Sequence, residues 1–169
     1  NKLVVGEKSR EVIDITKSIT ENLQNIAKAE GKAVSDLTVY ILDKPRHKPM
    51  IEEIRKAGAR ITLHTDGDVL GALLAAMPNT GVDVLMGIGG TPEGVLAACA
   101  IKALNGGMQG MRAPQLEDEK EQLKKDGVKI DEVLTLDTLV TSDNTIFSAT
   151  GITSGGYLDG VKKNNDGSI

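Results

Sequence analysis

The stretch Val82–Gly94, with the sequence VDVLMGIGGTPEG, decides how this 169-residue chain folds. Its first five residues are almost continuously apolar, which is typical of a strand buried on both faces of a sheet. The glycines that follow let the backbone turn tightly and approach a ligand closely. Thr91 and Pro92 suit the cap and the first position of a helix, which the apolar run 95–104 continues. The stretch therefore predicts a buried strand, a glycine loop and a helix.

Two similar units precede this one. A strand at 37–42 leads to a helix at 49–57 that ends before Gly58, and a strand at 60–64 leads to a helix at 68–77 that ends before Pro78. Strands that alternate with helices favour an α/β fold, in which helices flank a largely parallel or mixed sheet. We expect three βα units over residues 37–105.

The flanking segments complete a single expected domain. Apolar residues recur at three- and four-residue steps over 8–30, which predicts an amphipathic helix. The interleaved acids and lysines of 115–126 indicate a solvated helix. Residues 133–141 and 145–150 have the composition of strands, and we expect them to form a C-terminal β-hairpin over 133–150. The tail 160–169 is polar.

The composition narrows the class of protein. The chain is 40% hydrophobic and 26% charged, with a net charge of -4. This balance gives no general attraction to nucleic acid or to an anionic membrane. No apolar stretch approaches the ~20 residues that span a bilayer. Cys99 is the only cysteine, so no disulfide can form within the chain. The lone cysteine favours a reducing, cytoplasmic location. We also expect a homo-oligomer.

The loop between the first strand and helix of the series is strongly basic. Its sequence, Asp43–Lys48, contains three certain cations and His47. Cations are unfavourable at a helix N-terminus, so their placement makes sense if an anion lies between them and the helix dipole. A solvated basic loop, with Asp43 as a turn residue, is the alternative.

Two further loops carry carboxylates. Asp66 and Asp68 flank Gly67, where they could bind a metal, accept hydrogen bonds from sugar hydroxyls or cap the following helix. Glu93 lies in the first turn after the glycine loop, where it could hold a cation or simply favour the helix. Free N–H groups at that helix N-terminus form an anion site. Because these loops leave the carboxyl ends of strands, they share one sheet edge, and the combination suits a phosphorylated polyol.

At these loops the chain resembles the class II fructose-1,6-bisphosphatases of bacteria. The resemblance rests on segments in matching order and spacing over nearly the whole chain: Lys44–His47, Thr65–Asp68, Gly87–Gly94, Met108–Gly110 and Asp143–Gly151. It implies a layered fold related to inositol monophosphatases and other lithium-sensitive phosphatases.

The resemblance also implies an activity and roles for individual residues. The family hydrolyses fructose 1,6-bisphosphate to fructose 6-phosphate in gluconeogenesis, with Mg²⁺ or Mn²⁺ as cofactor. By position, the segment Lys44-Pro45-Arg46 would bind substrate, with Lys44 and Arg46 on the phosphate that is not cleaved. Asp66-Gly67-Asp68 would bind sugar hydroxyls, Gly90 would contact the substrate, and Glu93 would ligate a metal.

The resemblance covers only the C-terminal portion of the family. Its members are longer and carry most of their metal carboxylates, and a threonine that activates water, in an N-terminal half. We therefore expect no catalytic residue in this chain, a missing N-terminal half as its partner, and no activity from the piece alone. A sedoheptulose-1,7-bisphosphatase, or a dual-specificity enzyme, is the first alternative. The second is a non-catalytic sugar-phosphate-binding domain.

Overall fold

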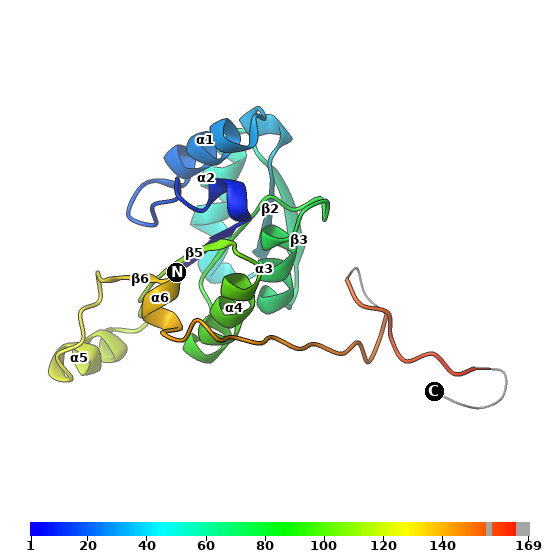
Figure 1. Cartoon of the computed structure of the whole chain (residues 1–169). Helices are drawn as coiled ribbons and strands as arrows, with labels where there is room; N and C mark the ends of the chain where they lie inside the picture. Colours follow the sequence, from blue (N-terminus) through cyan, green and yellow to red (C-terminus); the bar gives the residue numbers. More distant parts are fainter. Residues whose placement is uncertain (155–156, 165–169) are drawn as a thin grey trace.

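A single mixed sheet of six strands organises the protein. The structure is a computed structural model and describes residues 1–154 and 157–164. The strands, in the spatial order β3-β2-β4-β1-β5-β6, are bounded as follows: β1 Lys2–Val5, β2 Thr38–Leu42, β3 Arg60–His64, β4 Val84–Gly87, β5 Gly107–Met111 and β6 Val133–Thr135. The helices are α1 Ile19–Glu30, α2 Lys48–Ala57, α3 Asp68–Ala76, α4 Thr91–Ala103, α5 Glu117–Lys125 and α6 Leu136–Leu139. Figure 1 shows their arrangement.

The strands fall into a parallel half and an antiparallel half. β3, β2 and β4 are parallel, as the three βα units predicted. β1 runs against them and lies between β4 and β5, and β6 runs against β5. The expected α/β fold with a largely parallel or mixed sheet is confirmed, and the sheet is mixed because β1 and β6 are antiparallel to the other four strands.

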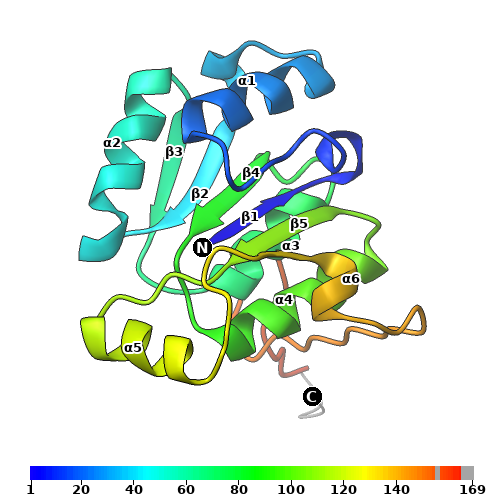
Figure 2. The same cartoon turned by 90° about the vertical axis from the view of Figure 1, so that its left-hand side faces the viewer.

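Helices cover both faces of the sheet (Figure 2). On one face, α1 and α2 bury aliphatic side chains such as Leu23, Ile26 and Ile54 against β2 and β4. On the other face, α3 and α4 present mainly alanines, among them Ala72 and Ala98. These small side chains let α3 and α4 pack closely on the sheet and on each other.

The predicted helix 8–30 is wrong in its first half. Glu7–Ser9 forms a 3₁₀ turn, residues 10–17 are turns and loop, and α1 starts only at Ile19. The reason is a capping box: the Ser18 hydroxyl accepts the Glu21 N–H at 3.2 Å, and the Glu21 carboxylate accepts the Ser18 N–H at 3.2 Å. Because these bonds satisfy free N–H groups at the N-terminus of α1, the helix begins directly after Ser18 and does not extend back toward residue 8.

The predicted hairpin over 133–150 is also wrong. Strand β6 ends at Thr135, whose hydroxyl accepts the Thr138 N–H and caps the short helix α6. Residues 140–154 form no strand, and they leave the body as an extended segment (Figure 1). Lys102 of α4 holds the start of this segment through the Val140 carbonyl at 2.9 Å.

The charged segment behaves as expected, over shorter bounds. α5 has no buried residue, and both cartoon views show it standing apart from the layers (Figures 1 and 2). Of the predicted polar tail, residues 160–164 are irregular and 165–169 lie outside the described residues.

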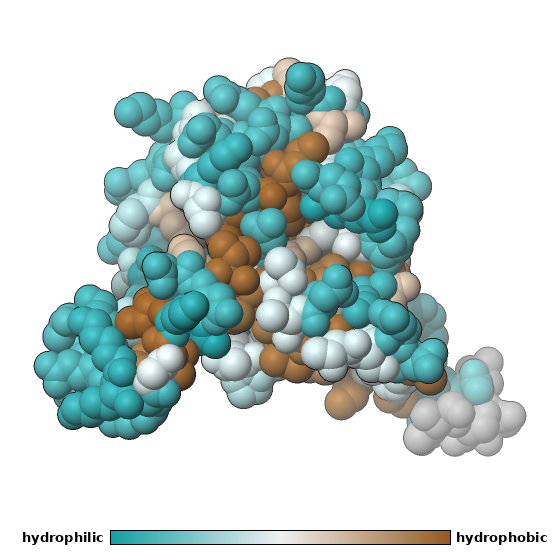
Figure 3. All heavy atoms as spheres, turned by 60° about the vertical axis from the view of Figure 1, so that its left-hand side comes forward, coloured by the Kyte–Doolittle hydropathy of each residue, from teal (hydrophilic) through white to brown (hydrophobic). Residues whose placement is uncertain are grey.

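Some large apolar side chains remain on the surface, and Figure 3 shows apolar areas among the hydrophilic ones on one side of the molecule. Val95 and Leu96 on α4 are 39% and 50% exposed. None of the described helices combines the length and the apolar character needed to cross a bilayer.

Candidate functional site

The three predicted loops meet at one edge of the sheet. β2, β3 and β4 run in the same direction and end at Leu42, His64 and Gly87. The antiparallel strand β1 starts at this same edge, because Lys2 pairs with Gly87 on one side and with Gly110 on the other. The edge therefore gathers the three predicted loops and the start of β1, which the sequence did not predict; the end of β5 and the start of β6 lie at the same edge.

The basic loop reaches toward both neighbouring loops. Pro45–His47 forms a 3₁₀ turn that leads directly into α2. The Lys44 ammonium lies 3.8 Å from the Asp66 carboxylate of the β3 loop. The exposed Arg46 donates its Nε–H to the Ile88 carbonyl of the glycine loop at 2.9 Å. Its terminal nitrogens remain able to meet an anion, because only Nε is used in this bond.

His47 is buried and links two loops. Only 1% of its surface is exposed. Nδ1 lies 2.7 Å from the Leu42 carbonyl, so it must donate. Nε2 accepts the Ile88 N–H at 2.8 Å, the shorter of its two contacts with Ile88, and lies 3.1 Å from the Ile88 carbonyl. This pattern is that of a neutral imidazole with its proton on Nδ1. The sequence counted His47 among the residues of a basic loop, whereas its contacts are those of a buried connector.

Tyr40 of β2 holds the loop Thr65–Asp68, called the aspartate loop below, in place. Its hydroxyl lies 3.2 Å from the Asp66 carbonyl and 3.0 Å from the Gly67 carbonyl. Its ring stacks on His64 at 3.9 Å between centroids. Burial and the carboxylates of Asp68 and Asp66 raise the pKa of the Tyr40 hydroxyl, which therefore stays a neutral donor.

The two aspartates have different environments. Gly67, with a φ of 90°, is the N-cap of α3, and no side chain caps that helix. The Asp66 side chain is 88% exposed, whereas Asp68 is 18% exposed and forms an ion pair with the buried Lys2. Capping therefore accounts for neither side chain. Lys2, which the sequence reasoning missed, places a cation inside the site.

The glycine loop packs directly on this ion pair. A Cβ on Gly89 would lie 2.6 Å from the Asp68 carboxylate and 2.9 Å from the Lys2 ammonium. The loop thus contacts the β1 start through Lys2, the β3 loop through Asp68 and the β2 loop through His47. Gly89 permits this approach because it has no side chain.

Helix α4 starts at the end of the glycine loop. Its N-cap is Gly90 rather than the predicted Thr91, and no side chain caps it. The exposed Glu93 in the first turn folds back on Gly90, since its carboxylate occupies the place of a Gly90 Cβ. Uncapped N–H groups at this end can bind an anion, with the Glu93 carboxylate beside it.

These residues do not complete a metal centre. Within the part of the chain that the structure describes, no three His, Cys, Asp or Glu side chains come together as a cation site. Glu93 can supply one oxygen ligand, whereas a hard divalent cation takes about six. Water, substrate oxygens or groups outside the described residues would have to supply the other ligands.

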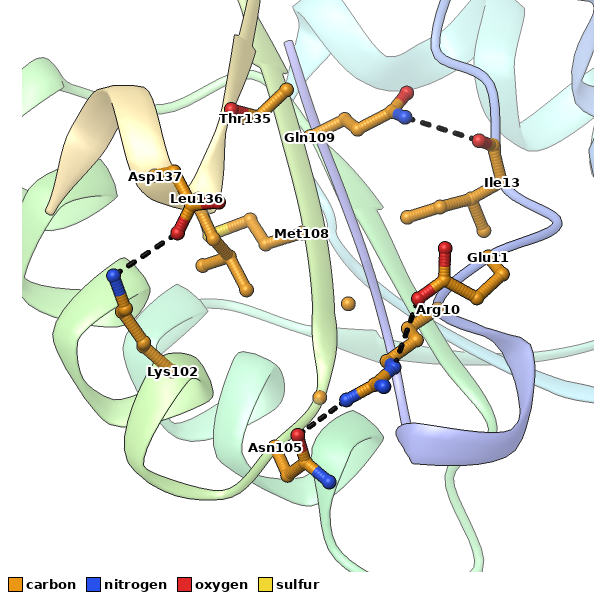
Figure 4. Close-up of a pocket in the computed structure, with 12 residues that line it drawn as sticks. Arg10, Glu11, Ile13, Lys102, Asn105, Met108, Gln109, Thr135, Leu136 and Asp137 are labelled. Carbon is orange, nitrogen blue, oxygen red and sulfur yellow. Dashed lines mark hydrogen bonds and ion pairs between the residues drawn. The ribbon is translucent and has the colours of Figure 1, made fainter. Parts of the chain in front are cut away.

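A hollow of about 340 Å³ lies at the edge of the sheet opposite the candidate site (Figure 4). Its cations have partners within the chain: Arg10 meets Glu11 and Asn105, and Lys102 meets Asp137 at 3.0 Å. Among the described residues, every buried side-chain polar atom has a hydrogen-bond partner. Nothing in this hollow indicates a ligand.

Comparison with known proteins identifies the family. The model of the family described as "Bacterial fructose-1,6-bisphosphatase, glpX-encoded" matches residues 1–169, the whole chain. The chain belongs to this family. The fructose-1,6-bisphosphatase class 2 of Haemophilus influenzae is 45% identical over 175 residues, and the fructose-1,6-bisphosphatase 1 class 2 of Escherichia coli is 42% identical over 175 residues.

The match is unequal in coverage. It takes in 96% of this chain but only 53% and 52% of these two relatives. The chain therefore spans about half the length of the fructose-1,6-bisphosphatases that it matches. The resemblance to the family is confirmed.

Sequence reasoning found the loops and missed what connects them. It named Lys44, Arg46, Asp66, Asp68 and Glu93, and the structure places all five at the carboxyl edge of the sheet. The roles of these residues, and of Pro45, Gly67 and Gly90, stay predictions. Lys2 and Tyr40 were not foreseen, because neither lies in a motif, and the contacts of His47 were not foreseen because its partner Ile88 is 41 residues away.

Proposed function

We propose that this chain is the substrate-binding half of a metal-dependent fructose-1,6-bisphosphatase that releases the 1-phosphate. The observation that carries the proposal is the meeting of Lys44, Arg46, Asp66, Asp68 and the uncapped α4 N-terminus at one sheet edge. The names of the two relatives support the same reaction.

In this proposal the basic loop holds the phosphate that stays on the sugar. Arg46 presents its terminal nitrogens as a planar pair of donors, which suits a phosphate. Lys44 adds a second charge on the same side. Binding here positions the substrate and leaves the bond to be broken at the far end of the sugar.

The aspartate loop and the glycine loop hold the rest of the substrate. Asp66 is exposed and can accept hydrogen bonds from sugar hydroxyls, and Asp68 is held in place by its ion pair with Lys2. Gly90 lets the substrate approach the α4 backbone. Glu93 would contribute one ligand to Mg²⁺ or Mn²⁺, which polarises a phosphate and activates water in such hydrolases.

Arg46→Ala in the full-length protein tests the proposal. We expect KM for fructose 1,6-bisphosphate to rise more than kcat falls, because binding rather than the cleaved bond is affected. Arg55→Ala is the matched control, since Arg55 is an exposed arginine at the other end of α2. A loss confined to kcat would move Arg46 to the cleaved phosphate. Absence of hydrolysis by the wild type, with either metal added, would end the proposal.

Two alternatives remain as outcomes of this assay. Faster turnover of sedoheptulose 1,7-bisphosphate would change the substrate and keep the site. Saturable binding of fructose 1,6-bisphosphate without hydrolysis by the full-length protein would favour a non-catalytic sugar-phosphate-binding domain. The incomplete metal ligand set of the described residues favours that outcome for the isolated chain.

A further inference from the structure

We infer that His47 is a positioning residue that fixes the glycine loop against the basic loop, through one acceptor contact to the Ile88 N–H. The inference rests on the proposed function for its effect on substrate binding, while its structural part stands alone. His47 touches no substrate in this view and acts through Ile88.

The two peptide units that flank the Ile88 Cα are each held by one of two consecutive residues. His47 Nε2 accepts its N–H at 2.8 Å, and Arg46 Nε donates to its carbonyl at 2.9 Å. Two bonds from one turn to one residue of another loop leave that residue little freedom. Ile88 therefore sets the position of the two glycines that follow it.

The imidazole is suited to this task because its other nitrogen is anchored. Nδ1 donates to the Leu42 carbonyl at 2.7 Å, on the last residue of β2. This bond fixes the tautomer with the proton on Nδ1, so Nε2 offers a lone pair to the Ile88 N–H. The ring thus joins the end of β2 to the residue after β4, at a buried position where water cannot replace it.

The position of Ile88 matters for both ends of the substrate. On one side, its carbonyl orients the Arg46 guanidinium, which faces the phosphate in the proposed function. On the other, Gly89 lies against the Asp68 carboxylate and Gly90 opens the α4 N-terminus. If the glycine loop lost its contact with His47, all of these binding groups would shift at the same time. Such a shift weakens substrate binding more than it slows the reaction.

Two variants separate the contact of His47 with the Ile88 N–H from its contact with the Leu42 carbonyl. In His47→Gln, the amide oxygen reaches the place of Nε2 and can still accept the Ile88 N–H. In His47→Asn, the shorter amide keeps a donor for the Leu42 carbonyl and loses the acceptor. His64→Asn is the control, because His64 stacks on Tyr40 and does not contact Ile88.

Hydrogen exchange on the full-length protein gives the first measurement. We expect the segment 84–90 to exchange faster in His47→Asn, with wild-type protection in His47→Gln and in His64→Asn. Nitrogen NMR of the imidazole should report the Nδ1–H tautomer in the wild type. Equal exchange in wild type and both His47 variants, or equal loss in both, would overturn the inference.

Steady-state kinetics give the second measurement. We expect KM for fructose 1,6-bisphosphate to rise roughly 3- to 10-fold in His47→Asn, the size of one lost hydrogen bond. It should change less than about twofold in His47→Gln, since that variant keeps the bond. Faster exchange with an unchanged KM would overturn the positioning role. A wild type without activity would refute the proposed function and leave the exchange experiment decisive for His47.

Discussion

Two glycines inside helices should respond in opposite directions to the same substitution. Gly71 lies in α3 and Gly94 in α4. Helix propensity alone predicts that alanine stabilises either helix by roughly 0.5–1 kcal/mol. The surroundings decide otherwise for Gly71. A Cβ there would overlap the Tyr40 ring and come within 2.8 Å of Leu85, whereas a Cβ on Gly94 meets nothing within 4 Å.

The side chains that a Cβ on Gly71 would overlap are buried and have no room to move. Tyr40 is 1% exposed and is wedged against His64. Forcing an extra methyl into such a core costs about 1–3 kcal/mol, which outweighs the propensity gain. We expect Gly71→Ala to lower the free energy of unfolding by about 0.5–2 kcal/mol and Gly94→Ala to raise it by up to about 1 kcal/mol.

Denaturant unfolding of the full-length protein, followed by circular dichroism, measures both changes. Because the Tyr40 hydroxyl holds the Asp66 and Gly67 carbonyls, Gly71→Ala should also raise KM for fructose 1,6-bisphosphate. A Gly71→Ala variant that is more stable than the wild type would refute the close packing of α3 on β2. A Gly94→Ala variant destabilised by more than about 1 kcal/mol would show that packing, not propensity, governs α4 as well.

Further perturbations address the site, the pH response and the isolated chain. Lys2→Met leaves the Asp68 carboxylate without its buried partner, so we expect the free energy of unfolding to fall by about 1–3 kcal/mol. The double variant Lys2→Met with Asp68→Asn should regain part of this stability, because it no longer carries the unpaired carboxylate. The Ser18 hydroxyl and N–H hold the pKa of Glu21 below its usual value of 4.5, so its contribution to stability is present above pH 4.5 and fades as the pH falls. The thermal midpoints of wild type and Glu21→Gln should then converge in acid, and a constant gap would contradict the capping box. The 169-residue chain alone should release no phosphate from fructose 1,6-bisphosphate with Mn²⁺ or Mg²⁺, and activity of the isolated chain would place catalytic groups within it. In the full-length protein, the Glu93→Gln variant should lose most of its turnover, because it loses a metal ligand.

The parallel half of the sheet was predictable because its signals are local. β2 and β4 are apolar runs followed by loop residues, and the predicted helix bounds at α2 and α3 agree within one residue. The predicted sheet edge followed from topology, since parallel strands end on the same side. The sequence alone therefore predicts that the lysine, the arginine and the carboxylates of these loops lie together.

The antiparallel half depended on contacts between distant residues. β5, with the sequence GMQGM, contains two glycines and has none of the β-branched residues that mark a strand. β1 is four residues long and gains its place only from β4 and β5. The hairpin prediction failed because β-branched threonine also caps helices, as Thr135 does for α6. The Ser18 capping box could have been recognised from its spacing, whereas the roles of Lys2 and His47 depend on partners 66 and 41 residues away.

The insertion of β1 between two later strands sets an order of events during synthesis. Lys2–Val5 leaves the ribosome about 100 residues before β5, which completes the slot in which β1 pairs. At roughly 5–20 residues per second, the backbone groups of β1 that face β5 wait on the order of 5–20 s without their partners. Chaperone capture of this segment should therefore be brief and should end when β5 emerges.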